Sequence, residues 1–199
     1  MLEIALGSAL MYYFSTQAFE IEKKPPGTVY YTETLDSRNS SFTRNHREAV
    51  TIKPAVEDQF RGIVRQAYDY SCGSAALTTL LNGYGGLSLT EQQTMSGLLQ
   101  YGEYQRIVER RSFSLLDMKR FVSALGMNSG GYRGEFKDLT ALQQPAIVPI
   151  TYAGFKHFVV YKAYKDGRVY VADPSLGNIS FDQVRFQEIW DNNTLFIVD

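Results

Sequence analysis

Residue types that carry much of protein chemistry are scarce in this chain of 199 residues, which has one cysteine and two histidines. The single cysteine, Cys72, excludes an internal disulfide and a multi-cysteine zinc site. With only His46 and His157, a zinc enzyme would need carboxylate ligands, and the sequence has neither His-x-x-x-His nor His-Glu-x-x-His spacing. The composition therefore implies neither a metal nor an organic cofactor.

Long apolar runs and an excess of either charge are also absent. The chain carries 20 Lys and Arg against 21 Asp and Glu, a formal net charge of −1, which gives no reason to expect nucleic acid or an anionic membrane as partner. No apolar stretch approaches the ~20 residues of a membrane-spanning helix, and no Gly-x-x-x-x-Gly-Lys loop occurs. The sequence therefore holds neither a transporter core nor a nucleotide-driven module.

What is present suffices for one packed domain with an extension before it. Hydrophobic residues make up 44%, with 14 Tyr and 12 Phe, which argues against disorder of the whole chain. We expect a domain over residues 50–199 and an extension over 1–49. The apolar run Ile4–Phe14 fits either a signal-peptide core or an arm packed on the domain, and both stay open. The polar remainder of the extension is typical of a linker, with one strand at Thr28–Thr32 and with His46 as a solvated loop residue.

Helical periodicity marks the first half of the domain. The apolar stripe of Cys72–Tyr84 predicts a helix, whose start Ser71 can cap and which Gly85-Gly86 can end. Two further helix starts are predicted by capping-box spacing, Thr90 with Gln93 and Ser114 with Asp117.

The second half changes to short β-branched and aromatic runs separated by turn residues. The predicted strands are AIVPITY (146–152), HFVVYKAY (157–164), RVYVAD (168–173) and TLFIV (194–198). One more helical stretch, near 181–190, precedes the last strand. Helices followed by an antiparallel sheet predict an α+β fold with room for a cleft between the two halves.

The lone cysteine stands where a reactive thiol would be placed. A thiol reacts as the thiolate, and this form is favoured by the free N–H groups of a helix start and by a nearby histidine. Cys72 begins the predicted helix, and Gly73 would let a substrate backbone approach closely. Gln66, shortly before, could donate its amide, together with the Cys72 N–H, to a developing oxyanion. The alternatives are an inert buried cysteine and an ordinary loop glutamine.

His157 and Asp173 should lie on the two strands of one hairpin. A two-residue loop would place Asp173 opposite Val160, on the other face from His157. A three-residue loop, 165–167, places it opposite Val159, and His157 then becomes its diagonal neighbour at roughly 7–8 Å. Since Gly167 suits the left-handed third position of such a loop, we predict the three-residue loop with a Gly bulge. Asp173 would then orient His157, whereas the alternatives are a strand histidine and an aspartate that only shapes a turn.

These motifs together resemble a known family. The stretch RQAYDYSCGSAALTTLL, followed by HFVV and VADPSLG, is similar to the bacteriocin-processing, double-glycine leader peptidases, which are papain-like cysteine endopeptidases often fused to ABC exporters. The resemblance covers Ile63–Val198. It implies a papain-like fold and four roles, namely Cys72 as nucleophile, His157 as general base, Asp173 as the residue orienting it and Gln66 as oxyanion-hole donor.

The same resemblance implies a cysteine endopeptidase that cleaves an exported protein or leader peptide after small residues. Stand-alone relatives belong to envelope export and assembly, including functional-amyloid fibre systems, and the stretch before Cys72 is closest to that subgroup. We therefore expect a peptide or protein substrate from such a system, and a periplasmic or membrane-associated location in a bacterium, with the cytoplasm left open. Two rivals remain, a module that binds a leader or fibre subunit without cutting it, and a transglutaminase-like transfer enzyme.

Overall fold

The computed structural model describes residues 28–32, 47–51, 55–152 and 154–199. The chain divides into two compact units, Met1–Ala55 and Val56–Asp199. In the first unit, β1 (Thr28–Thr32) pairs antiparallel with β2 (Arg47–Thr51). The strand predicted at Thr28–Thr32 is therefore confirmed, whereas the run Ile4–Phe14 and His46 lie outside the described residues.

Seven α-helices are described after β2, and the four expected helices are among them. They are α2 (Ala55–Gln59), α3 (Cys72–Gly83), α4 (Glu91–Tyr101), α5 (Tyr104–Arg110), α6 (Leu115–Ala124), α7 (Phe136–Thr140) and α8 (Gln183–Ile189). Both predicted capping boxes are present, at the starts of α4 and α6. The short helices α2, α5 and α7 were not predicted, because five to seven residues carry too little apolar periodicity to stand out.

Six antiparallel strands form the sheet of the second unit, in the order β3-β8-β4-β5-β6-β7. Their bounds are β3 (Ser129–Arg133), β4 (Ala146–Tyr152), β5 (Phe155–Lys165), β6 (Arg168–Asp173), β7 (Gly177–Asp182) and β8 (Thr194–Val198), with a 3-10 turn η1 (Asp191–Asn193) before β8. The four predicted strands are confirmed. The outer strands β3 and β7 were missed, and the helix expected from Phe181 begins only at Gln183, because Phe181 and Asp182 still belong to β7.

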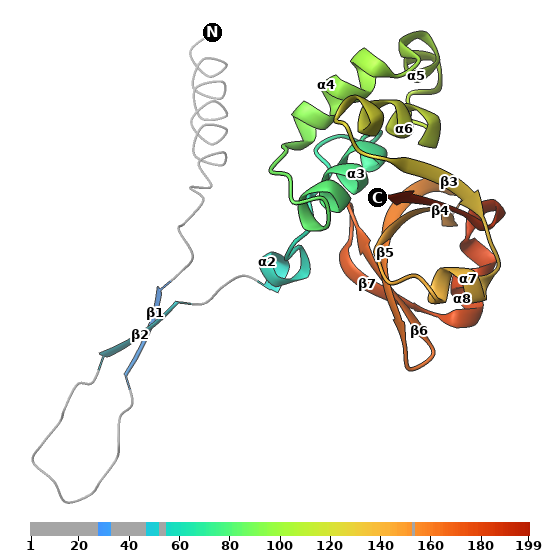
Figure 1. Ribbon diagram of the computed structural model, residues 1–199. Helices are drawn as coiled ribbons and strands as arrows, with labels where there is room; N and C mark the ends of the chain where they lie inside the picture. Colours follow the sequence, from blue (N-terminus) through green and yellow to red (C-terminus); the bar gives the residue numbers. More distant parts are fainter. Residues whose placement is uncertain (1–27, 33–46, 52–54, 153) are drawn as a thin grey trace, which may run out of the picture. The chain divides into compact units, whose positions relative to one another are not determined.

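Both faces of this sheet are covered by helices (Figure 1). Helix α3 packs on β4 and β5, and α4 and α6 extend that layer. Neighbouring residues of one strand point to opposite faces of the sheet. Ile147 packs in the cluster that contains α3, and Val148 packs in the cluster that contains Phe186 of α8. Two buried faces explain why β4 and the middle of β5 are continuous apolar runs without alternation.

The predicted α+β fold, with the cysteine at a helix start and an antiparallel sheet in the C-terminal half, is confirmed. Within the part of the chain that is described, no helix combines the length and apolar character needed to cross a bilayer.

Candidate active site

The hairpin of β5 and β6 sets the register of the candidate site, and its turn differs from the prediction. Lys165 pairs with Arg168, so the loop has two residues, Asp166 and Gly167. Both adopt left-handed backbone angles, with φ of 52° and 75°. This pattern is typical of a type I′ turn, whose twist matches that of the strands. The predicted three-residue loop with a Gly bulge is therefore wrong.

A β-bulge further along β5 restores the register that the site needs. Tyr161 pairs with Val171, whereas Ala163 pairs with Tyr170, so Lys162 is the extra residue between them. Beyond the bulge the pairing is shifted by one residue. Val160 pairs with Ala172, so the next pair of positions along the hairpin is Val159 and Asp173. His157 and Asp173 therefore share one face of the sheet, as the sequence predicted. The bulge at Lys162, and not a three-residue loop, produces this register.

His157 and Asp173 form a direct pair. The distance from His157 Nε2 to Asp173 Oδ1 is 2.8 Å, and the two side chains are 18% and 4% exposed. The same carboxylate oxygen accepts the backbone N–H groups of Ser175 (2.7 Å) and Leu176 (3.1 Å). Burial opposes the charge of Asp173, yet the hydrogen bond and charge of His157, with those two N–H groups, hold the pKa of Asp173 below its usual range. Asp173 thus bonds the histidine and the backbone of the turn after β6 with one oxygen.

Cys72 is the first residue of α3 and is partly exposed. Ser71 makes no capping hydrogen bond to this helix, so the prediction that it caps the start is wrong. Its hydroxyl instead donates to the Tyr68 carbonyl at 2.9 Å and accepts the Tyr68 N–H at 3.1 Å. The first N–H groups of an α-helix have no partner inside the helix, so the start of α3 keeps donors beside the thiol.

Gly73 serves packing rather than substrate access. A Cβ at Gly73 would lie 3.0 Å from Met118 Cε and 3.4 Å from Phe158 Cδ2, both in the core. The expectation that its missing side chain admits a substrate backbone is therefore wrong. Because Phe158 follows His157 and Gly73 follows Cys72, this contact holds the two candidate residues close to each other.

Cys72 lies beside His157 and contributes to the shift in the pKa of that histidine. Since Nε2 of His157 faces Asp173, Nδ1 is the ring nitrogen left for the thiol. Burial alone would lower the pKa of His157, but the hydrogen bond and charge of Asp173, together with the neighbouring Cys72, outweigh it and raise the pKa to about 9. The arrangement therefore favours an imidazolium paired with the Asp173 carboxylate at neutral pH.

Gln66 lies in the loop that leads to α3. Its backbone N–H donates to the Pro174 carbonyl at 3.0 Å, which ties Gln66 to the chain just after Asp173. Its amide Nε2 donates one hydrogen to the Tyr68 carbonyl at 3.3 Å and carries a second. The structure thus brings Cys72 next to the hydrogen-bonded pair of His157 and Asp173 and sets the backbone of Gln66 beside that pair.

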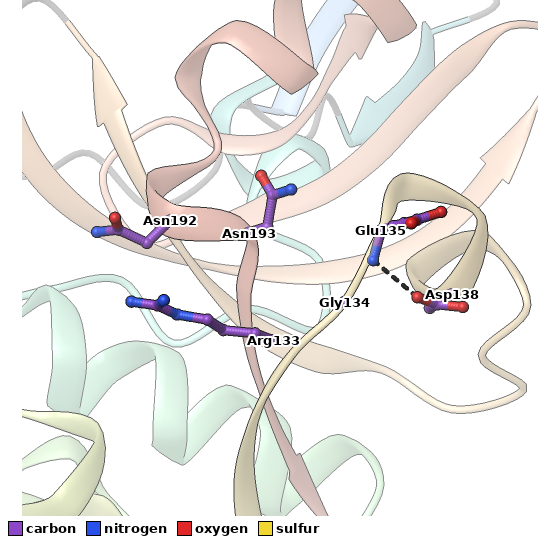
Figure 2. A pocket seen from close by; sticks show the side chains of 6 residues that line it. All are labelled: Arg133, Gly134, Glu135, Asp138, Asn192 and Asn193. Carbon is purple, nitrogen blue, oxygen red and sulfur yellow. Dashed lines mark hydrogen bonds between the residues drawn. The ribbon is translucent and has the colours of Figure 1, made fainter.

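A second feature of the described surface lies away from the candidate residues. A cavity of about 610 Å³ lies between the end of β3 and η1, where Glu135 N–H donates to Asp138 Oδ2 at 2.7 Å (Figure 2). None of the four candidate residues lines it. Among the residues described, no three His, Cys, Asp or Glu side chains gather closely enough to hold a metal ion.

Comparison with known proteins decides the family. The model of the peptidase C39 family matches residues 61–199. The chain belongs to the peptidase C39 family. This match confirms the resemblance drawn from the sequence and, with it, the class of cysteine peptidases as the chain's family.

Two curated relatives of this C39 chain come from pseudomonads. It is 42% identical over 147 residues to the "Probable functional amyloid protease FapD" of Pseudomonas aeruginosa, and 36% identical to the protein of the same name from Pseudomonas fluorescens. Each match covers 74% of this chain and 64% of the relative, so the chain spans less than two thirds of the length of these relatives.

Solved structures support the fold of this C39 chain. One is a double-glycine motif protease from an AMS/PCAT transporter, crystallised with a leader peptide, at 23% identity and a TM-score of 0.57 over 68% of this chain and 89% of that one. Another is the peptidase domain of Streptococcus ComA, at 18% identity and a TM-score of 0.56 over 68% and 96%. At this identity the likeness shows a shared papain-like fold.

Proposed function

We propose that this protein is a cysteine endopeptidase, with Cys72 as nucleophile, His157 as general acid and base, Asp173 as the residue that orients His157, and Gln66 as an oxyanion donor. The observation that carries the proposal is the pair of His157 and the buried Asp173, joined at 2.8 Å, with the Cys72 thiol beside the same imidazole. A thiol beside an imidazolium at an uncapped helix start is the environment that makes a cysteine nucleophilic.

The proposed reaction uses these groups in sequence. The Cys72 sulfur attacks the scissile carbonyl, and the developing oxyanion is stabilised by the free N–H groups at the start of α3 and by the Gln66 amide. His157 then donates a proton to the leaving amine, which breaks the peptide bond and leaves an acyl-enzyme. His157 next takes a proton from water, which attacks the thioester and releases the second product.

The proposed substrate is an exported protein or a leader segment with small residues at the cut. Support for a peptide in this place comes from exposed apolar side chains within a few residues of each candidate group, Tyr70 before Cys72, Phe155 before His157 and Leu176 after Asp173. An apolar cavity of about 270 Å³, lined in part by Tyr68, Ile107 and Phe113, adjoins the loop before Cys72 and fits an apolar side chain of the peptide.

The setting is proposed from the relatives. Because relatives at 42% and 36% identity are named functional amyloid proteases, we propose a substrate from a fibre-assembly or export system of a bacterium. We place the enzyme in the periplasm or at the membrane, where such a substrate would be met.

The test compares alkylation of Cys72 by iodoacetamide in the natural protein and in His157→Ala. At about pH 6 the natural protein should react at least about tenfold faster than N-acetylcysteine, and the variant should lose this advantage. A peptide cut by the natural protein should stay intact with Cys72→Ala. If the thiol reacts like N-acetylcysteine in both proteins, the peptidase proposal fails and a binding module takes its place; if a small amine captures the acyl-enzyme as the main product, a transfer enzyme does.

A further inference from the structure

A buried carboxylate behind the candidate site is not used by the proposed mechanism. Glu91, the first residue of α4, is 7% exposed. Its Oε2 accepts the backbone N–H of Ala67 at 2.9 Å, and its Oε1 accepts the Ser74 hydroxyl at 3.4 Å. It takes part in none of the salt bridges formed by the described residues. A buried charge is costly, so these two polar contacts are its compensation.

The two contacts of Glu91 join the two segments that carry the proposed oxyanion donors. Ala67 directly follows Gln66, and Ser74 lies in the first turn of α3, two residues after Cys72. The single hydrogen of the Ser74 hydroxyl is shared between the Ser71 carbonyl at 2.8 Å and the more distant Glu91 carboxylate, so this hydroxyl is held at the helix start. Glu91 therefore bridges the Gln66 loop and the N–H groups beside the thiol.

The Gln66 loop is held from three sides. Gln66 N–H bonds the Pro174 carbonyl, and the Val64 N–H donates to Thr79 Oγ1 at 2.9 Å. Those two bonds fix the loop against β6 and the middle of α3. Hydrogen bonds between Tyr68 and Ser71 tie the end of the loop to the residue before α3, and the bond from Ala67 to Glu91 holds the residue next to Gln66.

Glu91 is itself placed rigidly. Thr90 and Gln93 form a complete capping box around it, with bonds of 2.8 and 3.2 Å, so the carboxylate is fixed in the first turn of α4. A carboxylate at this position is also favoured by the N-terminal end of the α4 dipole. It is thus suited to hold the loop at a constant distance.

We propose that Glu91 is a positioning residue that sets the Gln66 amide against the first turn of α3 and so completes the oxyanion site. This inference rests on the proposed function, because it assigns Glu91 a role through Gln66. Under this proposal, two properties of the site depend on different residues. Forming the reactive thiol depends on His157 and Asp173, whereas stabilising the oxyanion depends on Glu91.

Two probes separate these properties. Iodoacetamide alkylates the thiolate at a saturated carbon and forms no oxyanion. The p-nitrophenyl ester of acetyl-Gly-Gly acylates the thiol through a tetrahedral oxyanion and releases p-nitrophenolate, which is measured by absorbance. Both rates are compared for the natural protein, Glu91→Met, which has similar length but accepts no such bond, and Glu91→Gln, which keeps one carbonyl acceptor for the Ala67 N–H.

We expect Glu91→Met to lower the acylation rate by roughly 10-fold or more, because the variant should behave like one that has lost an oxyanion donor. The alkylation rate should stay within about twofold of that of the natural protein. Glu91→Gln should recover most of the acylation rate. Should Glu91→Met fail to fold, Glu91→Asp, which draws the carboxylate back from Ala67, should show the same separation. In a Gln66→Ala background, Glu91→Met should add little, because both changes remove one interaction.

The matched control is Asp117→Asn, another buried carboxylate that accepts backbone N–H groups but contacts neither the Gln66 loop nor α3. It should leave the ratio of the two rates unchanged. Equal losses of both rates in the Glu91 variants would show that Glu91 is a structural residue and would overturn the proposal. The proposal would also fail if neither rate fell, or if the effects of Glu91→Met and Gln66→Ala on acylation were fully additive. Failure of the proposed function is distinct, because it appears in the natural protein as slow alkylation without dependence on His157.

Discussion

Two helices of this protein begin after a serine, and the two starts are built in opposite ways. At α6, the Ser114 hydroxyl accepts the Asp117 N–H at 3.2 Å, and the Asp117 carboxylate accepts the Ser114 N–H at 2.8 Å. At α3, Ser71 turns its hydroxyl to Tyr68 and leaves the helix uncapped. The first start is closed by its own side chains, and the second keeps its donors for another molecule.

The residue three positions after the serine explains the difference. In α6 it is Asp117, which can reach back to the serine and complete the box, whereas in α3 it is Ser74, whose hydroxyl is taken by the Ser71 carbonyl. A capping box stabilises a helix, so leaving α3 without one costs stability. Function at the Cys72 end of α3 is therefore obtained at the expense of a local contribution to folding.

The largest expected effect is a difference in peptide cleavage between variants of the two buried aspartates, Asp173 and Asp117. Asp173→Asn removes the charge that holds the imidazolium of His157, and peptide cleavage should fall by roughly 10²-fold or more. Asp117→Asn weakens the contact with Arg110 at 3.0 Å and should lower the free energy of unfolding by about 1–3 kcal/mol while cleavage persists. Cleavage assays and urea unfolding of both variants check this. A large loss of activity in Asp117→Asn would erase the proposed division between the two regions.

The next effect is the pH dependence of stability. The pKa of His157 is raised from 6.5 to about 9, so the stability it contributes is complete below about pH 6.5 and is lost as the pH rises to about 9. This corresponds to roughly 3 kcal/mol at most. The lowered pKa of Asp173 acts in the opposite direction, contributing stability above about pH 3.8 that is lost at lower pH.

Urea unfolding from pH 5 to 10, followed by the fluorescence of the single, buried Trp190, measures this dependence. The fall in stability between about pH 6.5 and 9 should be present in the natural protein and absent in His157→Ala. A parallel fall in both proteins would assign the titration to other groups.

The smallest expected effect concerns the capped start alone. Ser114→Ala removes the hydroxyl that accepts the Asp117 N–H and should lower the free energy of unfolding by about 1 kcal/mol. The iodoacetamide reactivity of Cys72 should not change, because the Ser114 hydroxyl bonds with Asp117 and takes part in no hydrogen bond to Cys72 or His157 among the described residues. Thermal unfolding together with the alkylation rate tests both parts, and a changed alkylation rate would contradict the separation.

The sequence predicted the parts of the fold that rest on local patterns. The capping boxes at Thr90 and Ser114 and the apolar runs of β4, β6 and β8 all lie where they were expected. The outer strand β3 escaped notice because SGGYR has two glycines and exposed residues, and it is a strand only because β8 lies beside it. A pattern within one segment cannot reveal a partner strand more than sixty residues away.

The candidate site was predictable in its residue types and less so in its construction. His157 and Asp173 were placed on one face by the correct register, although the bulge at Lys162 has no sequence signature that distinguishes it from a longer turn. Glu91 was missed as a contributor, because its contact with Ala67 joins two segments through tertiary packing. The Thr90 capping box did place a carboxylate at that helix start, and this was the available signal.

The bulge at Lys162 also divides the long β5–β6 hairpin into two stretches with separate requirements. The inner stretch must keep its register, since a one-residue slip would turn Asp173 to the opposite face from His157. The outer stretch, from Ala163 to Tyr170 with the Asp166-Gly167 turn, carries no candidate residue. Its tip is accordingly the natural attachment point for a peptide tag or an inserted reporter in a protein that must stay active.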